Sequence, residues 1–171
     1  MDNSGNNQCG TKCSTEGGKK GYCPVKCLLL PGLVVFAVIL VFNWVFHGIL
    51  MMPSYKATAS VWRSEEQMQS FCYIGVICQL ITALVITCLY GWLSSKKSDC
   101  DSQCPIGLGA KFGFKIGVLL GITQLNYYVY LPIPKTIALS WFAGGVVEGV
   151  LVGVVLGFLY RMKCKKEACK A

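Results

Sequence analysis

The stretch LLLPGLVVFAVILVFNWVFHGILMM, from Leu28 to Met52, decides the fold, because it is almost entirely apolar and contains no Asp, Glu, Lys or Arg. A helix needs about 20 such residues to cross the hydrocarbon core of a bilayer. Three further stretches approach or exceed that length, at 71–93, 106–131 and 136–160. In lipid the backbone must satisfy its own hydrogen bonds, and long apolar runs do so as helices. The sequence therefore predicts an all-α integral membrane protein of four transmembrane helices, arranged as two hairpins.

The composition agrees with a membrane protein. Of the 171 residues, 54% are apolar and only 14% are charged, which is too little polar surface for a water-soluble domain of this size. We expect a disordered tail containing cysteine and lysine at 1–27, a four-helix transmembrane domain at 28–160, and a second tail at 161–171. The first apolar run is too long, and lies too far from Met1, for a cleaved signal peptide.

The positive charges predict the orientation in the membrane. Eleven of the 16 lysines and arginines lie in the two tails and in the loop between the second and third spans: Lys12, Lys19, Lys20, Lys26, Lys96, Lys97, Arg161, Lys163, Lys165, Lys166 and Lys170. The opposite side has only Lys56, Arg63 and Lys135. Because positive loops stay in the cytoplasm, both termini are expected there. The net charge of +8 then reflects topology and contact with anionic headgroups, so the expected partner is the lipid bilayer and not nucleic acid.

Two internal patterns concern the architecture. The segment Asn43-Trp-Val-Phe-His47, followed by Pro53, parallels Asn126-Tyr-Tyr-Val-Tyr130, followed by Pro132, which suggests a tandem repeat of one hairpin. Glycine also recurs every four residues in the last two spans, at Gly109, Gly113, Gly117 and Gly121 and at Gly145, Gly149, Gly153 and Gly157. Such ridges let helix backbones approach closely in lipid. We expect them to pack within the bundle, with a homo-oligomer interface as the alternative.

Eight of the 11 cysteines form four close pairs on the predicted cytoplasmic side: Cys9 with Cys13, Cys23 with Cys27, Cys100 with Cys104, and Cys164 with Cys169. Thiols are kept reduced in that compartment, so metal binding is favoured over disulfides. Zinc, monovalent copper and an iron–sulfur cluster are the candidate cofactors. The pairs at 23/27 and 100/104 lie nearest the membrane and are expected to form the better site. Unligated thiols, acylation at Cys27 and Cys164, and disulfides in an inverted topology remain alternatives.

Ionisable and amide side chains inside the spans are the other candidate functional residues. Glu148 lies near the middle of the fourth span and Lys115 lies at a similar depth in the third, so an ion pair between them is one hypothesis. A structural role for Glu148 is favoured over a proton or cation relay. Asn43 and His47 are four residues apart on one face of the first span, near its outer end. His47 is expected to be a hydrogen-bonded interfacial residue.

Three classes of function follow from these residues. No catalytic set is visible, so an enzyme is not expected. The favoured interpretation is a membrane protein of unassigned activity that binds a thiophilic metal through its cytoplasmic cysteine pairs. One alternative is a small transporter or channel for a soft metal ion, with His47, Met51 and Met52 at its outer entrance. The other is a structural or assembly subunit that packs through its glycine ridges.

The run from Asn43 to Met51, which begins Asn-Trp-Val-Phe-His-Gly, and the run from Tyr55 to Arg63, which reads YKATASVWR, resemble a group of small uncharacterised bacterial membrane proteins. The turn at 131–134 and the stretch 141–148 are similar too, and the likeness covers roughly residues 35–161. The resemblance implies a multi-pass protein with four spans in a bacterial inner membrane. It implies no activity, and it leaves out the cysteine-bearing tails.

Overall fold

The computed structural model describes residues 25–96 and 105–168, with side chains at 28–94 and 106–162. Its long helices are α1 (Val25–Val45), α3 (Glu65–Lys96), α4 (Pro105–Leu125) and α5 (Lys135–Ala168). Short helices connect them: the π-helix η1 (Phe46–Leu50), α2 (Met52–Ala57), and the 3₁₀ helices η2 (Ala59–Val61) and η3 (Asn126–Val129). All of these elements are helical, and the described ranges contain no strand, which confirms the all-α prediction.

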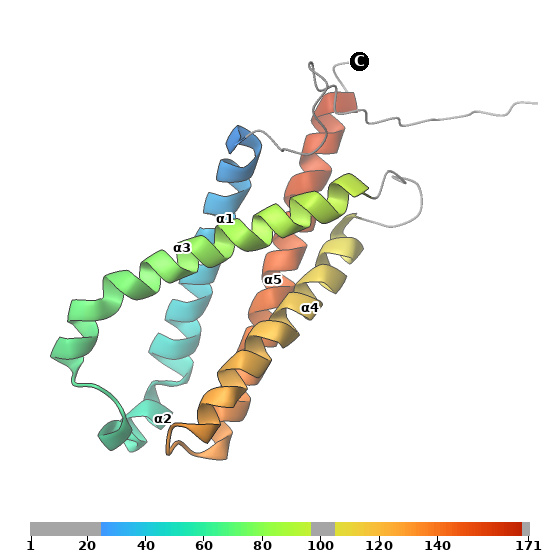
Figure 1. The fold of residues 1–171 in the computed structure, drawn as a ribbon. Coiled ribbons are helices and arrows are strands. Elements are labelled where there is room, and N and C mark those ends of the chain that lie inside the picture. The colour runs from blue at the N-terminus through green and yellow to red at the C-terminus, as the bar shows by residue number, and fades with distance from the viewer. Residues whose placement is uncertain (1–24, 97–104, 169–171) are drawn as a thin grey trace, which may run out of the picture.

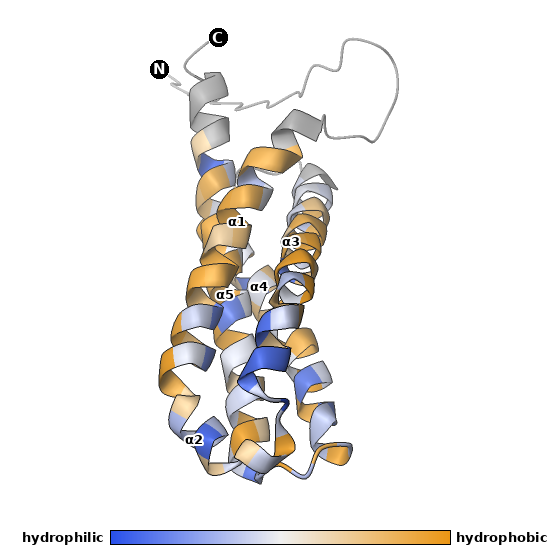
Figure 2. Ribbon diagram, turned by 90° about the vertical axis from the view of Figure 1, so that its left-hand side faces the viewer, coloured by the Kyte–Doolittle hydropathy of each residue, from blue (hydrophilic) through white to orange (hydrophobic). Residues whose placement is uncertain are grey.

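Four helical stretches are long and apolar enough to cross a membrane: Leu28–Leu50, Glu65–Ser94, Ile106–Val129 and Lys135–Met162. They correspond closely to the four predicted spans and confirm that the chain has four helices with the length and apolarity of a multi-pass membrane protein. The second begins earlier than the apolar run at 71–93, because a helix continues to satisfy its backbone hydrogen bonds through polar residues beyond the hydrocarbon core. Figure 2 shows hydrophobic residues along most of the length of α1, α3 and α5.

Helices α4 and α5 lie side by side along their length (Figure 1), because their two glycine ridges face each other. All eight ridge glycines are buried. A Cβ atom added at Gly117 would lie 2.8 Å from the carbonyl oxygen of Gly145, and one added at Gly153 would lie 2.7 Å from the Cα of Gly113. The ridges therefore bring backbone against backbone within one chain. Association with a second copy through them stays a prediction, and in this structure each ridge is covered by the other.

Helix α3 crosses the bundle obliquely (Figure 1) and packs on α1 through side chains. The main core cluster has members from α1, α3 and α5: Val35, Ile39, Ala83, Ile86, Tyr90, Val152 and Leu156. The first part of α3, at 65–78, is exposed throughout. Its apolar side chains, including Phe71, Ile74 and Ile77, form the outward face expected of a helix in lipid.

The two ends of the bundle carry different features. The beginnings of α1 and α4 and the final turns of α3 and α5 lie at one end, which we call the terminal end (Figure 1). The short helices α2, η2 and η3 lie at the other, which we call the α2 end. The predicted cysteine pairs adjoin the terminal end in sequence, whereas His47 belongs to the α2 end.

Candidate functional site

The hydroxyl of Tyr55 is the centre of a hydrogen-bond network at the α2 end. Its oxygen lies 2.6 Å from Nδ1 of His47 and accepts a hydrogen bond of 2.8 Å from the indole Nε1 of Trp141. These residues come from η1, α2 and α5, so the network connects both halves of the chain. His47 is therefore a hydrogen-bonded residue, as the sequence predicted, although its partner Tyr55 was not foreseen.

The backbone around His47 is a π-helix, which explains how the imidazole reaches Tyr55. The amide of Met51 donates to the carbonyl of Phe46, five residues earlier, at 2.9 Å. Pro53 follows and has no N–H to continue the α-helical pattern, and it occupies the first turn of α2 instead. The wider π turn changes the direction of the side chains that follow it, and such turns are frequent at functional sites.

Aromatic rings enclose the Tyr55 hydroxyl. The ring of Trp62 meets that of Tyr55 edge to face at 5.3 Å and lies 6.0 Å from that of Trp141. Its indole N–H donates to Thr58 Oγ1 at 2.9 Å, which holds the ring in place. Burial raises the pKa of Tyr55, and the hydrogen bond from Trp141 lowers it by less. The phenol consequently keeps its proton at neutral pH.

The network assigns the tautomer of His47. An indole N–H can only donate, so the Tyr55 oxygen accepts from Trp141, and its own proton needs another acceptor. Among the described residues that acceptor is Nδ1 of His47. The Nδ1 lone pair is then occupied, and the ring carries its proton on Nε2. This assignment rests on hydrogen-bond satisfaction rather than on an observed hydrogen.

One helical turn deeper, Asn43 and Glu148 form a polar contact between α1 and α5. The Asn43 side-chain nitrogen donates to Glu148 Oε1 at 3.2 Å and also to the carbonyl of Ile39 at 3.1 Å. The hypothesis that Glu148 pairs with Lys115 is wrong within the described residues. Lys115 is exposed on α4, because it lies on the side of that helix opposite the glycine ridge.

The thiols and thioethers do not converge in the described part of the chain. Cys72, Cys78 and Cys88 are exposed on α3, and no group of three or more His, Cys, Asp or Glu residues is arranged to hold a metal in the two described ranges. Met51 is buried in a cluster with Ile133, so its sulfur is not presented at an outer entrance. All eight paired cysteines fall outside the side chains that the structure describes: Cys9, Cys13, Cys23, Cys27, Cys100, Cys104, Cys164 and Cys169.

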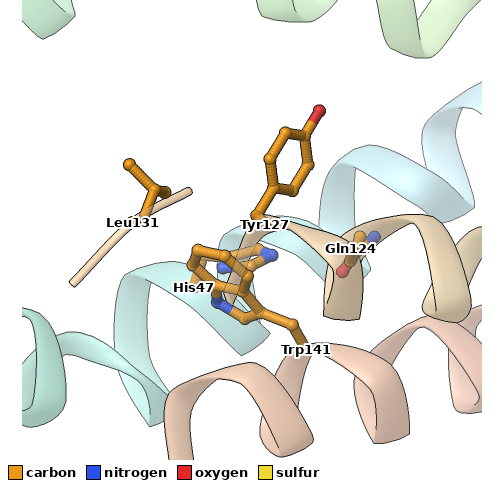
Figure 3. A pocket seen from close by; sticks show the side chains of 5 residues that line it. All are labelled: His47, Gln124, Tyr127, Leu131 and Trp141. Carbon is orange, nitrogen blue, oxygen red and sulfur yellow. The ribbon is translucent and has the colours of Figure 1, made fainter. Parts of the chain in front are cut away.

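A shallow, open cavity of about 310 Å³ adjoins the network (Figure 3). Its lining consists of His47, Gln124, Tyr127, Leu131 and Trp141. Gln124 and Tyr127 come from adjoining turns where α4 passes into η3, and the rings of His47 and Trp141 lie beside them (Figure 3). The sequence carried no signal for Gln124, which is one of two amides, with Asn126, near the end of an apolar run. No protein-family model, curated protein or solved structure matches the chain.

Proposed function

We propose that the chain is a bacterial inner-membrane protein of two helical hairpins, related as a tandem repeat, that binds a thiophilic metal ion at its cytoplasmic face. The supporting observation is the arrangement of the helix ends. The beginning of α1, the end of α3, the beginning of α4 and the end of α5 all lie toward the terminal end, with the ends of α3 and α4 set below those of α1 and α5 (Figure 1). Every cysteine pair except the one at 9/13 lies within or next to one of these four ends.

Because the cysteine-bearing segments begin or end at helices at the terminal end of the bundle, their thiols have less distance to cover before they can share one metal ion. Cys27 belongs to the first turn of α1, Cys164 to the last turns of α5, and Cys104 directly precedes α4. Four thiolates drawn from these segments suit tetrahedral zinc, and monovalent copper or an iron–sulfur cluster would accept the same ligands. Zinc sites in small domains supply about 10–16 kcal/mol, which exceeds the cost of ordering a few residues at about 1–2 kcal/mol each.

Metal content tests this proposal. The full chain, purified without oxygen or chelators, should contain zinc, copper or iron, and the Cys100→Ser, Cys104→Ser double variant should lose most of it. The matched control is Cys72→Ser with Cys78→Ser, which removes two cysteines that are exposed on α3. Its metal content should equal that of the native protein. Near-zero metal in the native protein, or equal metal in all three proteins, would refute the proposal.

The cytoplasmic orientation is tested separately. In a variant that keeps only Cys100 and Cys104, a membrane-impermeant thiol reagent added to intact cells should leave both unmodified. The reagent should react with them after the membrane is permeabilised. Strong labelling in intact cells would invert the topology and, with it, the redox argument for metal over disulfides.

A further inference from the structure

The cavity beside His47 has the composition of a site for a small neutral ligand. Its five lining residues include no Asp, Glu, Lys or Arg, so it offers an ion no opposite formal charge. The polar groups it offers are the imidazole of His47 and the amide of Gln124, among the ring surfaces of Tyr127 and Trp141 and the Leu131 side chain, while the Tyr127 hydroxyl points away from the other four residues (Figure 3). Its volume of about 310 Å³ lies at the lower end of the range of small-molecule sites, about 300–1,000 Å³.

His47 presents a hydrogen-bond donor to this cavity. Tyr55 and Trp141 hold the imidazole with its Nδ1 occupied, which leaves the Nε2–H as its free polar group. Within the described part of the chain, no bond to Nε2 accompanies the one to Nδ1. The atom is also not among the buried side-chain atoms that lack a partner, which are Gln79 Oε1 and Ser94 Oγ in those ranges. An acceptor arriving in the cavity can therefore reach it.

We propose that this cavity binds a neutral, membrane-soluble ring bearing carbonyl groups, of the quinone class, with a carbonyl oxygen accepting a hydrogen bond from His47 Nε2–H. The Gln124 amide lines the same cavity and supplies its second hydrogen-bonding group. Trp141 and Tyr127 supply apolar ring surface beside it. The cavity lies where the third span ends at Val129 and the fourth begins at Lys135, so a ligand dissolved in the bilayer enters near the headgroup level.

The chain has a single histidine, which makes His47 a specific reporter. The full chain labelled with ¹⁵N-histidine and placed in lipid nanodiscs should show a protonated Nε2 and an unprotonated Nδ1 by NMR. Titration with duroquinone, a neutral tetramethyl quinone, should shift the Nε2 resonance in a saturable way and leave Nδ1 hydrogen-bonded to Tyr55. A shift that grows linearly with quinone, as simple partitioning into the bilayer would produce, or no shift at all, would overturn the proposal.

Two variants and a second probe sharpen the titration. Gln124→Leu removes one hydrogen-bonding group and should weaken duroquinone binding roughly two- to tenfold, the effect of one hydrogen bond. Gln67→Leu is the matched control, because Gln67 is exposed on α3, and it should bind as the native protein does. Equal affinities of the native and Gln124→Leu proteins would remove Gln124 from the site. A saturable response to tetramethylammonium in place of duroquinone would reassign the cavity to a cation held by aromatic rings.

Discussion

The α4–α5 pair and the α1–α3 pair are both packed helix pairs, but the first packs through its backbones and the second through its side chains. Helices α4 and α5 have almost no side chain between them, and their glycine ridges lie backbone to backbone. Helices α1 and α3 meet through a cluster of Val35, Ile39, Ala83 and Tyr90, and the first part of α3 diverges until it is fully exposed. Apolarity alone therefore does not determine which helices associate closely.

The physical reason for this difference is that the solvent of a membrane helix is lipid and not water. In lipid, apolar side chains gain nothing by leaving the surroundings for a helix interface, so association depends on close packing and on hydrogen bonds. Glycine ridges provide close packing along most of α4 and the middle of α5. Helix α1, which has no such ridge, meets α5 through side chains of the main core cluster, through the Asn43–Glu148 contact and through the Tyr55 network. The two regions should therefore respond differently to substitution.

The largest effect is expected for Gly153→Leu. A Cβ at this position would lie 2.7 Å from the Cα of Gly113, where only backbone could move. Forcing these helices apart should lower the free energy of unfolding by more than the roughly 1–3 kcal/mol typical of overpacking, as measured by denaturation in mixed micelles. Gly75→Leu, with nothing within 4 Å, should be close to neutral. Equal stability of both variants would show that the α4–α5 contact contributes nothing.

Alanine at two glycines compares the two helix pairs directly. At Gly32 a Cβ would meet the Leu84 Cδ2 at 2.8 Å, the end of a flexible side chain that can rotate away. At Gly113 it would meet the Cα of Gly153 at 2.8 Å. Gly113→Ala should therefore destabilise the protein more than Gly32→Ala in the same assay. A larger loss for Gly32→Ala would contradict the distinction between backbone and side-chain packing.

An intermediate effect is expected for Tyr55→Phe. The substitution keeps the ring but leaves the Trp141 N–H without its acceptor and His47 Nδ1 without its donor. Leaving such groups unsatisfied should cost about 1–3 kcal/mol, accompanied by a change in tryptophan fluorescence. Tyr73→Phe, at an exposed position of α3, is the control and should change neither quantity. An unaltered histidine NMR spectrum in Tyr55→Phe would exclude the His47–Tyr55 hydrogen bond, from which the tautomer was inferred.

The smallest effect is expected for Asn43→Leu. It removes the donor to Glu148, and hydrogen bonds between membrane helices average about 0.6 kcal/mol. Asn126→Leu, at an exposed position of η3, serves as the control. A loss well above about 2 kcal/mol for Asn43→Leu would mean that this contact, and not side-chain packing, holds α1 against α5.

Sequence patterns determined the features that depend on composition and spacing. Four apolar runs specified four spans, because the bilayer sets the length of a helix that crosses it. Glycine at every fourth residue specified a flat ridge on α4 and another on α5, because that spacing keeps the glycines on one helix face.

The tertiary structure determined which side chains contact one another. Glu148 meets Asn43 and not Lys115, because the glycine ridge places Lys115 on the outward side of α4 while α1 approaches α5 from another direction. Tyr55 joins His47 and Trp141 across 86 residues of sequence, which requires the π turn before Met51 and the placement of α2 under the bundle. Such contacts depend on how each helix is rotated about its axis and shifted along it. An apolar sequence facing lipid does not specify the rotation or the shift, which are fixed only when the helices pack.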